Sequence, residues 1–522
     1  MIIDRSWNQK EHRLTISYLD KQGNRKMYMK NLHHWKTYEY NPNGRLDTWN
    51  NKKCDAVFKD ASTYRPNEFD WLEYMYEMKN KDDEKEIYND LIANNPIRLY
   101  TYDIETEFEE GVFPEPELAE QRVTSISLVG PDLSVIVYGL KNMDNIQIER
   151  FRKRYIDWIH NNHFASVQLK KLGKEPKVFY QSFNSEQDLL KHWFNIIIPK
   201  IGILAGWNNY RFDRQYLVNR IIKLFGTNEA YNMIRNGSPT RELGKVSWEE
   251  VGGTRNKTLT SLHHAEMDYM LLIQKYEYAF RPYESYSLDW CGEHIINANK
   301  IKYNGTLQEL YEKDYEWYYY YNAIDSLIVQ LLHQRVKCIK SPAAVASLTL
   351  VPLQAALSQV TLTTAKLFSV FYRQGKHVVY NWDEVDRNRV PYEGAFCGCV
   401  PGRREFVACF DFKSLYPSCI MSENLSCENF VQAYTEPDSL GRKIPRAWTD
   451  EELEEFKKYP DQYFVTNQRH VYRNDKDYAF KICQKENTVN RDFYKYTGQR
   501  IDSELLVEID RLIKEKESVN ER

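Results

Sequence analysis

The sequence predicts an α/β protein of several domains (α+β multidomain), and its length and the order of its segments support this class. A chain of 522 residues is too long for one hydrophobic core and is expected to form about three or four domains. The apolar content of 42% is typical of a globular protein. After residue 97, strand-like runs come first and helical stretches follow them, which is the order of a mixed domain.

The first 95 residues are expected to form an N-terminal domain. Residues 14–19 and 25–29 alternate in the manner of strands around a glycine turn, and predict a hairpin. Residues 69–93 are highly charged and are expected to be helical, and the Asn94-Asn95-Pro96 sequence marks a boundary. Residues 341–378 begin with an apolar helical stretch, and we expect them to return to this domain.

Residues 96–340 are expected to form the second domain, with strands covered by helices. A hairpin is predicted over residues 248–260, turning at Gly252 and Gly253. The other expected elements are strands at 98–105, 123–129, 134–138 and 203–206, and helices at 145–162, 185–199, 213–225 and 314–338. The segment after about residue 449 is strongly charged and is expected to be mostly helical.

Charge and cysteine content exclude some classes of protein. The chain has 71 basic and 74 acidic side chains, so any nucleic-acid contact must come from local basic patches. The nine cysteines show neither zinc-site spacing nor a disulfide framework, which favours a reducing compartment. No signal peptide is expected, and no apolar run approaches the ~20 residues of a membrane span.

Two acidic sites stand in positions that favour metal binding. Asp103 and Glu105 are two apart on a predicted strand, so both side chains point to one face, where a cation would relieve their repulsion. A solvated strand face is the alternative. Asp213 opens a predicted helix, where an acid is often only a partner of the helix dipole.

Tyr321 and Asp325 are four apart on one predicted helix and therefore project together. A phenol beside a carboxylate can orient a water for nucleophilic attack. The alternative is a Tyr–Asp hydrogen bond on a surface helix.

The sequence D-F-K-S-L-Y-P-S, residues 411–418, follows an apolar run at 406–410. Asp411 would therefore stand at a strand end, placed to bind a metal. Ser414 and the neighbouring backbone could face a triphosphate, with Tyr416 as a flat wall. A strand end with a Tyr-Pro turn is the alternative. The eight residues resemble motif A of family B DNA polymerases.

The acidic sites, in this order before motif A, resemble the three motifs of the DEDDy 3′→5′ proofreading exonuclease of the same family. The resemblance implies an RNase H-like domain and two Mg²⁺ ions. It implies Asp103, Glu105, Asp213 and Asp325 as metal ligands, Tyr321 as the residue that positions water, and Asn208, Lys300, Gly252, Gly253 and Tyr392 as DNA contacts. It further implies Asp411 as a polymerase-site metal ligand, with Ser414, Leu415 and Tyr416 facing the dNTP.

Order, spacing and the sequence at 392–396 are most similar to polymerases of T-even-like bacteriophages, which implies the cytoplasm of an infected bacterium. Residues 379–475 would form a partial palm with motif A, and 476–522 the start of the fingers, where Arg491 and Lys495 have triphosphate-gripping spacing. Neither a motif B nor a motif C string follows Ser418. We therefore expect a second chain carrying motifs B and C, with a possible sliding clamp bound through it, or a truncated gene. The partners implied are primer–template DNA, a single-stranded 3′ end and dNTP. The alternatives are a stand-alone 3′→5′ exonuclease and a non-catalytic DNA-binding scaffold.

Overall fold

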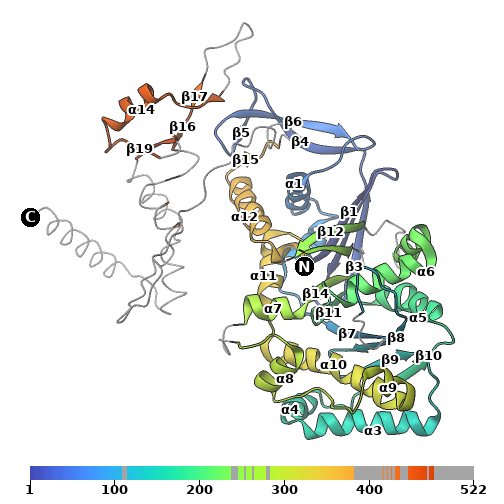
Figure 1. Cartoon of the computed structure of the whole chain (residues 1–522). Coiled ribbons are helices and arrows are strands. Elements are labelled where there is room, and N and C mark those ends of the chain that lie inside the picture. Colours follow the sequence, from blue (N-terminus) through green and yellow to red (C-terminus); the bar gives the residue numbers. More distant parts are fainter. Residues whose placement is uncertain are drawn as a thin grey trace, which may run out of the picture. The chain divides into compact units, whose positions relative to one another are not determined.

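A computed structural model of the chain forms two compact units, Met1–Trp49 with Lys53–Trp382, and Asn50–Lys52 with Asp383–Arg522 (Figure 1). The residues that the structure describes are 1–107, 114–236, 245–251, 254–260, 264–277, 283–380, 416, 420, 425, 429–434, 445–466 and 469–474. Within these residues, no helix is both long and apolar enough to cross a membrane.

The N-terminal residues form two small sheets. In the first sheet the predicted hairpin is confirmed, because β2 and β3 pair antiparallel around a turn that contains Gly23. Gly23 has a φ of 76°, and a Cβ there would lie 2.6 Å from the carbonyl oxygen of Pro96, so both its conformation and its surroundings favour glycine. The strands of the first sheet are β1 (Ile2–Asn8), β2 (Arg13–Leu19) and β3 (Arg25–Asn31), and those of the second are β4 (His34–Tyr40), β5 (Leu46–Thr48), β6 (Lys53–Asp60) and β15 (Lys376–His377).

Residues 69–93 are mostly helical, as predicted, but the helical stretch is interrupted at residues 79–84. The structure has two helices, α1 (Glu68–Met78) and α2 (Lys85–Ile92). The turn between them allows the Glu84 carboxylate to be buried, where it accepts hydrogen bonds from Tyr28 (2.7 Å) and Tyr74 (3.2 Å). This tertiary contact overrides the helical preference of the charged sequence.

The segment after residue 340 packs against the N-terminal elements. It contains α11 (Lys340–Thr349) and α12 (Gln359–Arg373) and leads into β15, which pairs with β5. On α12, Phe368 stacks on Phe69 with ring centroids 6.0 Å apart, and Tyr372 stacks on Tyr76 at 4.9 Å. Residues 341–378 therefore pack against α1, although residues 79–340 separate them from it in the sequence.

The residues between α2 and α11 contain a six-stranded mixed sheet with the order β10-β9-β8-β7-β11-β14. The strands β7, β8 and β9 are antiparallel to one another, whereas β10, β11 and β14 pair parallel with their neighbours. The four predicted strands are present, and β10 and β14 are additional. The bounds are β7 (Leu99–Thr106), β8 (Val123–Val129), β9 (Val135–Gly139), β10 (Val178–Ser182), β11 (Ile203–Gly206) and β14 (Ala265–Asp268).

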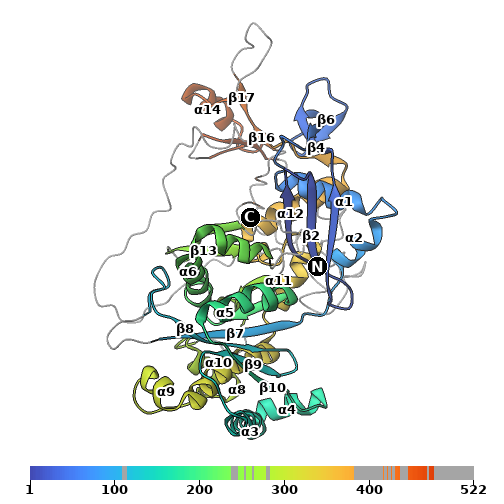
Figure 2. The same ribbon diagram turned by 90° about the vertical axis from the view of Figure 1, so that its right-hand side faces the viewer.

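Helices cover both faces of this sheet (Figure 2). Helix α10 (Tyr315–Val336) packs on β7, β8 and β9. On the other face, Tyr102 and Ile104 of β7 share a core with residues of α5 (Glu186–His192) and α6 (Asp213–Asn236). Because side chains alternate along a strand, Asp103 and Glu105 face α10.

The helices predicted at 145–162, 185–199, 213–225 and 314–338 are present, with small differences at their ends. Helix α6 is interrupted at Gly226, whose φ of 75° and ψ of 161° end the regular helix where the sequence predicts. Helix α5 continues as a π-helical turn (Trp193–Ile197) and a short 3₁₀ turn (Ile198–Lys200). The predicted helix at 145–162 is α3 (Asn145–Asn161). Four helices are additional to the prediction: α4 (His163–Leu172), α7 (Tyr269–Tyr276), α8 (Leu288–Ile296) and α9 (Leu307–Lys313).

The predicted hairpin around residue 252 is also present. Strand β12 (Lys245–Val251) pairs antiparallel with β13 (Thr254–Thr260), in register from Lys245–Thr260 to Val251–Thr254. Gly252 and Gly253 lie outside the described residues.

The described part of the second unit is small and mixed. Strand β20 (Val471–Arg473) pairs with β16 (Phe430–Val431) and β19 (Tyr463–Val465), and β17 (Ala433–Tyr434) pairs with β18 (Pro445–Arg446). Among the described residues between 449 and 474, only α14 (Asp450–Lys457) is helical, so the expectation of a mostly helical segment is wrong for them; residues 475–522 lie outside the described residues. The fold instead pairs strands from both sides of α14.

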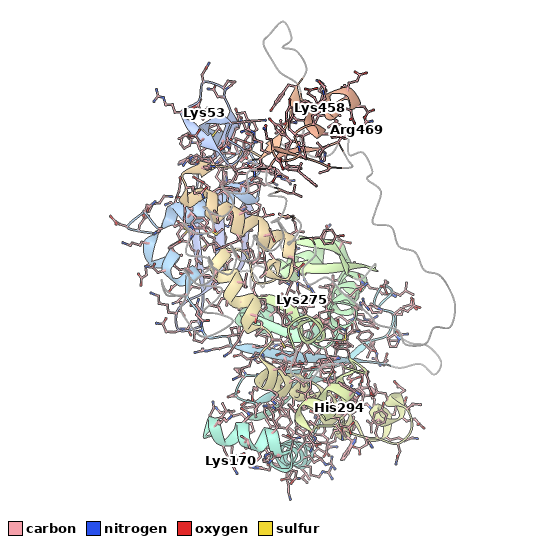
Figure 3. The ribbon with its side chains drawn as sticks, turned by 90° about the vertical axis from the view of Figure 1, so that its left-hand side faces the viewer. Lys53, Lys170, Lys275, His294, Lys458 and Arg469 are labelled. Atoms are coloured by element: carbon pink, nitrogen blue, oxygen red, sulfur yellow. The ribbon has the colours of Figure 1, made fainter. Side chains whose placement is uncertain are left out.

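An ion pair ties the start of α14 to the turn before β20. The Arg469 guanidinium lies 2.9 Å from the Asp450 carboxylate, and Figure 3 labels Arg469 together with Lys458, the residue that follows α14. Both charged partners are largely exposed, so the pair adds little to stability.

Candidate functional site

Three carboxylates converge where β7 faces α10. Asp103 and Glu105 project from β7, and Asp325 projects from the buried side of α10. Ligand oxygens of the three side chains lie within 4.8 Å of one another, close enough for one divalent cation to bind all three. The structure therefore brings together three of the four carboxylates that the resemblance implied as metal ligands of the exonuclease site.

A buried asparagine on α10 fixes one of these carboxylates. Asn322 donates a hydrogen bond from Nδ2 to Oδ2 of Asp103 at 2.8 Å, and its own Oδ1 accepts one from Ser125 of β8 at the same distance. Asn322 is fully buried. The sequence analysis missed it, although an amide between Tyr321 and Asp325 in an otherwise apolar helix segment is a usable signal.

Lys300 supplies a positive charge to the group. Its ammonium nitrogen lies 2.6 Å from Oδ2 of Asp325 and 3.3 Å from the phenol oxygen of Tyr321. Burial alone would lower the pKa of Lys300, but the combined effects of Asp325, Tyr321 and Asp103 raise this pKa above its ordinary value. Tyr321 and Lys300 thus lie at the edge of the carboxylate group.

Asp213 stands beside the group rather than inside it. It begins α6, and its Oδ1 accepts a hydrogen bond from the backbone N–H of Ile104 at 3.1 Å. The side chain is buried. Its carboxylate is therefore tied to the backbone between Asp103 and Glu105.

The pKa values of the four candidate ligands, Asp103, Glu105, Asp213 and Asp325, all lie above their ordinary values. Burial is the largest cause in each case, and neighbouring carboxylates add to it for Asp103 and Glu105. The pKa of Glu105 rises to about 8 and that of Asp213 to about 7, whereas those of Asp103 and Asp325 also lie above their ordinary values. A cation would relieve this repulsion.

The donor set fits a hard divalent cation such as Mg²⁺. All the candidate ligands are carboxylate oxygens, which such ions prefer. In addition, Oδ1 of Asp325 is buried and has no hydrogen-bond partner among the described residues. Buried polar atoms are normally satisfied, so this oxygen supports a ligand role.

The predicted DNA-contacting residue Asn208 lies in the turn before α6. Its φ of 59° is in the left-handed region, and its backbone N–H donates to Oδ1 of Asp268 at 3.2 Å. The N–H of Tyr210 donates to Oδ2 of the same side chain at 3.3 Å. Asp268 therefore fixes the turn that presents Asn208.

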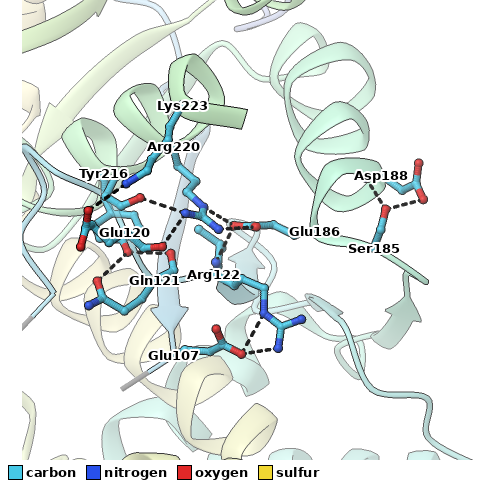
Figure 4. A network of polar contacts seen from close by, with 12 residues as sticks. Glu107, Glu120, Gln121, Arg122, Ser185, Glu186, Asp188, Tyr216, Arg220 and Lys223 are labelled. Carbon is cyan, nitrogen blue, oxygen red and sulfur yellow. Dashed lines mark hydrogen bonds and ion pairs between the residues drawn. The ribbon is translucent and has the colours of Figure 1, made fainter. Parts of the chain in front are cut away.

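An arginine of α6 holds the connection between β7 and β8 (Figure 4). Arg220 donates from Nε and Nη2 to the two oxygens of Glu186, at 2.8 and 2.7 Å. Its Nη1 donates to the carbonyls of Ala119 (3.0 Å) and Glu120 (2.6 Å). Arg220 and Glu186 are both buried, so this bidentate pair anchors the connection to α5 and α6.

Three further contacts fix the end of the same connection. The Tyr216 hydroxyl donates to the carbonyl of Gln121 at 2.7 Å, and Arg122 pairs with the Glu107 carboxylate. The backbone N–H of Glu107 also donates to the carbonyl of Arg122 at 2.8 Å. The base of the connection is thereby closed just beyond Glu105.

Most residues of the predicted polymerase site, and the predicted DNA contact Tyr392, lie outside the described residues. The polymerase-site residues concerned are Asp411, Ser414 and Leu415, and Arg491 and Lys495 also lie outside the described ranges. Tyr416 is described and is 75% exposed.

The fold and the carboxylate group define a mixed α/β protein with a candidate divalent-metal site. Residues 53–290 match the family model for the exonuclease domain of DNA polymerase family B, and residues 363–474 match the model for DNA polymerase family B. The chain thus belongs to DNA polymerase family B and comprises its exonuclease portion and part of its polymerase portion. Asp103, Glu105 and Asp213 lie within the first match, and Tyr321 and Asp325 lie beyond it.

Individual relatives agree with this assignment. The chain is 28% identical to the DNA-directed DNA polymerase of Escherichia phage RB69, over 65% of this chain and 36% of that protein. It is 25% identical to the DNA-directed DNA polymerase of Enterobacteria phage T4, over 64% and 36%. It is 27% identical to the DNA polymerase delta catalytic subunit of Bos taurus, over 63% and 28%. The chain therefore spans about a third of the length of the curated relatives that it matches.

Proposed function

We propose that this chain is a 3′→5′ DNA exonuclease that proofreads for a family B DNA polymerase in viral DNA replication. The observation that carries the proposal is the group of Asp103, Glu105 and Asp325, whose ligand oxygens lie within 4.8 Å of one another. Lys300 and Tyr321 border the group from one side. Within this proposal, residues 96–340 form an RNase H-like domain, and residues 1–95 with 341–378 form the N-terminal domain.

The carboxylates would hold two Mg²⁺ ions, with Asp213 contributing beside the three converging side chains. When bound, such ions lower the pKa of a coordinated water and stabilise the negative charge that develops on a scissile phosphate. The protein's part is to fix the ligands, which Asn322 does for Asp103 and Lys300 does for Asp325.

Tyr321 and Lys300 have separate proposed roles. The phenol of Tyr321 would orient the attacking water, since a positioned polar group beside the ligands serves this purpose. Burial, and then repulsion by Asp325, raises the pKa of Tyr321, so the phenol keeps its proton and can donate it in a hydrogen bond. The ammonium of Lys300 would stabilise negative charge on the phosphate.

The proposed substrate is the single-stranded 3′ end of a DNA primer. Asn208, the β12–β13 hairpin with Gly252 and Gly253, and Tyr392 would contact DNA, and the hairpin would separate the primer from its template. The location proposed is the cytoplasm of an infected bacterium, which the phage relatives support.

For the polymerase portion we propose that residues 379–475 form a partial palm and 476–522 the start of the fingers. Asp411 would bind metal, and Ser414, Leu415 and Tyr416 would face the dNTP. A single aspartate cannot position two ions for nucleotide transfer. Motifs B and C would come from a second chain, through which a sliding clamp could also act.

A primer–template assay tests both halves of the proposal. The purified chain is mixed with Mg²⁺ and a 5′-labelled primer, with and without dNTPs and with a mismatched or matched 3′ end. We expect stepwise shortening from the 3′ end, faster on the mismatch, and no extension. Extension would contradict the requirement for a second chain, and an intact primer in all conditions would favour a non-catalytic DNA-binding scaffold. Equal rates of shortening on the matched and the mismatched 3′ ends would favour a stand-alone exonuclease.

A further inference from the structure

Glu266 is a buried carboxylate on the sheet face opposite the candidate site. It lies on β14 and is 5% exposed. Glu266 pairs with Leu204 of β11, and Leu204 pairs with Tyr100 of β7. Tyr102 is two residues after Tyr100 on the same strand, so Glu266 and Tyr102 lie on the same face of the sheet. The Asp103 side chain points to the other face.

The side-chain contacts of Glu266 reach residues that are next to candidate site residues in the sequence. Its Oε1 accepts hydrogen bonds from Tyr102 at 2.6 Å and from Asn209 at 3.2 Å, and its Oε2 lies 3.3 Å from Nε of Arg214. Tyr102 precedes Asp103, Asn209 follows Asn208, and Arg214 follows Asp213. One carboxylate thus touches three segments that each carry a candidate site residue.

Glu266 itself is held from several sides. Its backbone carbonyl accepts hydrogen bonds from Tyr210 (2.7 Å) and Gln354 (2.6 Å), and His264 lies 3.4 Å from its Oε2. Burial alone would raise the pKa of Glu266, but the charge of Arg214 and the hydrogen bond from His264 lower it below its ordinary value. The side chain is therefore an anion in a fixed position.

We propose that Glu266 is a positioning residue that fixes the spacing between Asp103 and Asp213 for metal binding, acting through Tyr102 and Arg214. The inference rests on the proposed exonuclease function. The hydrogen bond to Tyr102 fixes the rotation of β7 at the residue before Asp103. The ion pair with Arg214 fixes the first turn of α6, where Asp213 begins the helix. Small displacements of metal ligands slow the catalysed reaction strongly, because reacting groups must be held in a well-defined geometry.

The N-terminal part of the chain offers a matched control. Glu84 is also a buried carboxylate that accepts a hydrogen bond from a tyrosine, Tyr28, at 2.7 Å, and it pairs with Lys30. It has no proposed role in the site. The pair Glu266→Gln and Tyr102→Phe is therefore compared with the pair Glu84→Gln and Tyr28→Phe.

The test measures Mn²⁺ affinity by electron paramagnetic resonance and single-turnover shortening of a single-stranded oligonucleotide, with urea unfolding for each variant. We expect Glu266→Gln and Tyr102→Phe to weaken Mn²⁺ binding by about tenfold and to slow shortening at saturating DNA by about 10- to 100-fold. The controls should lose comparable stability but keep wild-type Mn²⁺ affinity. Tyr102→Phe removes the hydrogen bond to Glu266 but leaves the charge of Glu266 unchanged. It therefore separates the effect of ligand position from the effect of charge, and it tests the positioning role even if Glu266→Gln does not fold.

Mn²⁺ affinities of Glu266→Gln and Tyr102→Phe that match those of the controls would overturn the positioning role. A wild-type chain that leaves DNA intact would instead overturn the proposed function. In that case the Mn²⁺ affinities still decide whether Glu266 positions the ligands.

Discussion

The ammonium nitrogen of Lys300 lies 2.6 Å from Oδ2 of Asp325, so the protein itself supplies a cation to its carboxylate group. Lys300 precedes α9 in the sequence and Asp325 lies in the middle of α10. The pair therefore joins two separate segments at the candidate site. Lys300 partly offsets the repulsion among the carboxylates, and it leaves Oδ1 of Asp325 available for a ligand role.

Lys300→Ala should lower the rate of 3′ shortening by about 100-fold, because removing one group that stabilises developing negative charge typically has an effect of this size. Single-turnover digestion of a labelled single strand measures the rate. The control is Lys302→Ala, since Lys302 is exposed on the same segment. Equal rates for the two variants would argue against a role of Lys300 in the site.

Tyr321→Phe should slow shortening by about 100-fold while leaving Mn²⁺ affinity unchanged, because the phenol would orient water rather than bind metal. The comparison variant is Tyr320→Phe, which alters the neighbouring buried ring on α10. A rate for Tyr321→Phe within twofold of that control would exclude water positioning by the phenol.

The raised pKa of Glu105 predicts how the free energy of unfolding of the metal-free chain depends on pH. Its pKa is about 8 in the folded chain against an ordinary 4.5, so the folded chain binds this proton more tightly than the unfolded chain. The resulting stabilisation is fully present below about pH 4.5 and is lost as the pH rises through about 8. Wild type should therefore lose stability over this window relative to Glu105→Gln. Urea unfolding in EDTA at several pH values measures the difference, and a difference independent of pH would contradict the shifted pKa.

The Arg220–Glu186 pair should matter for stability. Arg220→Met leaves a buried carboxylate without its bidentate partner and should lower the free energy of unfolding by about 3–5 kcal/mol. Arg152→Met is the matched control, because Arg152 is exposed and its ion pair with Glu149 is a surface pair. Urea unfolding of both variants checks this, and similar losses would mean that the connection between β7 and β8 is not anchored by Arg220.

The local geometry of the candidate site follows from short-range sequence patterns. The period of two along β7 places Asp103 and Glu105 on one face, and the spacing of four places Tyr321 and Asp325 on one side of α10. These pairs need only the correct secondary structure. The strands and long helices around them have strong periodic patterns and were predicted with small errors at their ends.

The contacts between elements were not predictable in the same way. Asn322 binds Asp103, and Glu266 binds Tyr102, only because the fold brings separate segments together. The break between α1 and α2 has the same origin, since it depends on the burial of Glu84. Strand β14 is four residues long and pairs only with β11 in the described sheet, so its sequence carries a weak signal.

The most direct test of the central claim is the release of the 3′-terminal nucleotide from a 3′-labelled single strand in Mg²⁺, by wild type and by Asp103→Ala/Glu105→Ala. The account predicts release of the labelled nucleotide by wild type, none in EDTA, and none by the double variant, which should remain folded in a thermal melt. Unchanged release by the folded double variant would contradict the assignment of the carboxylate group as an exonuclease site.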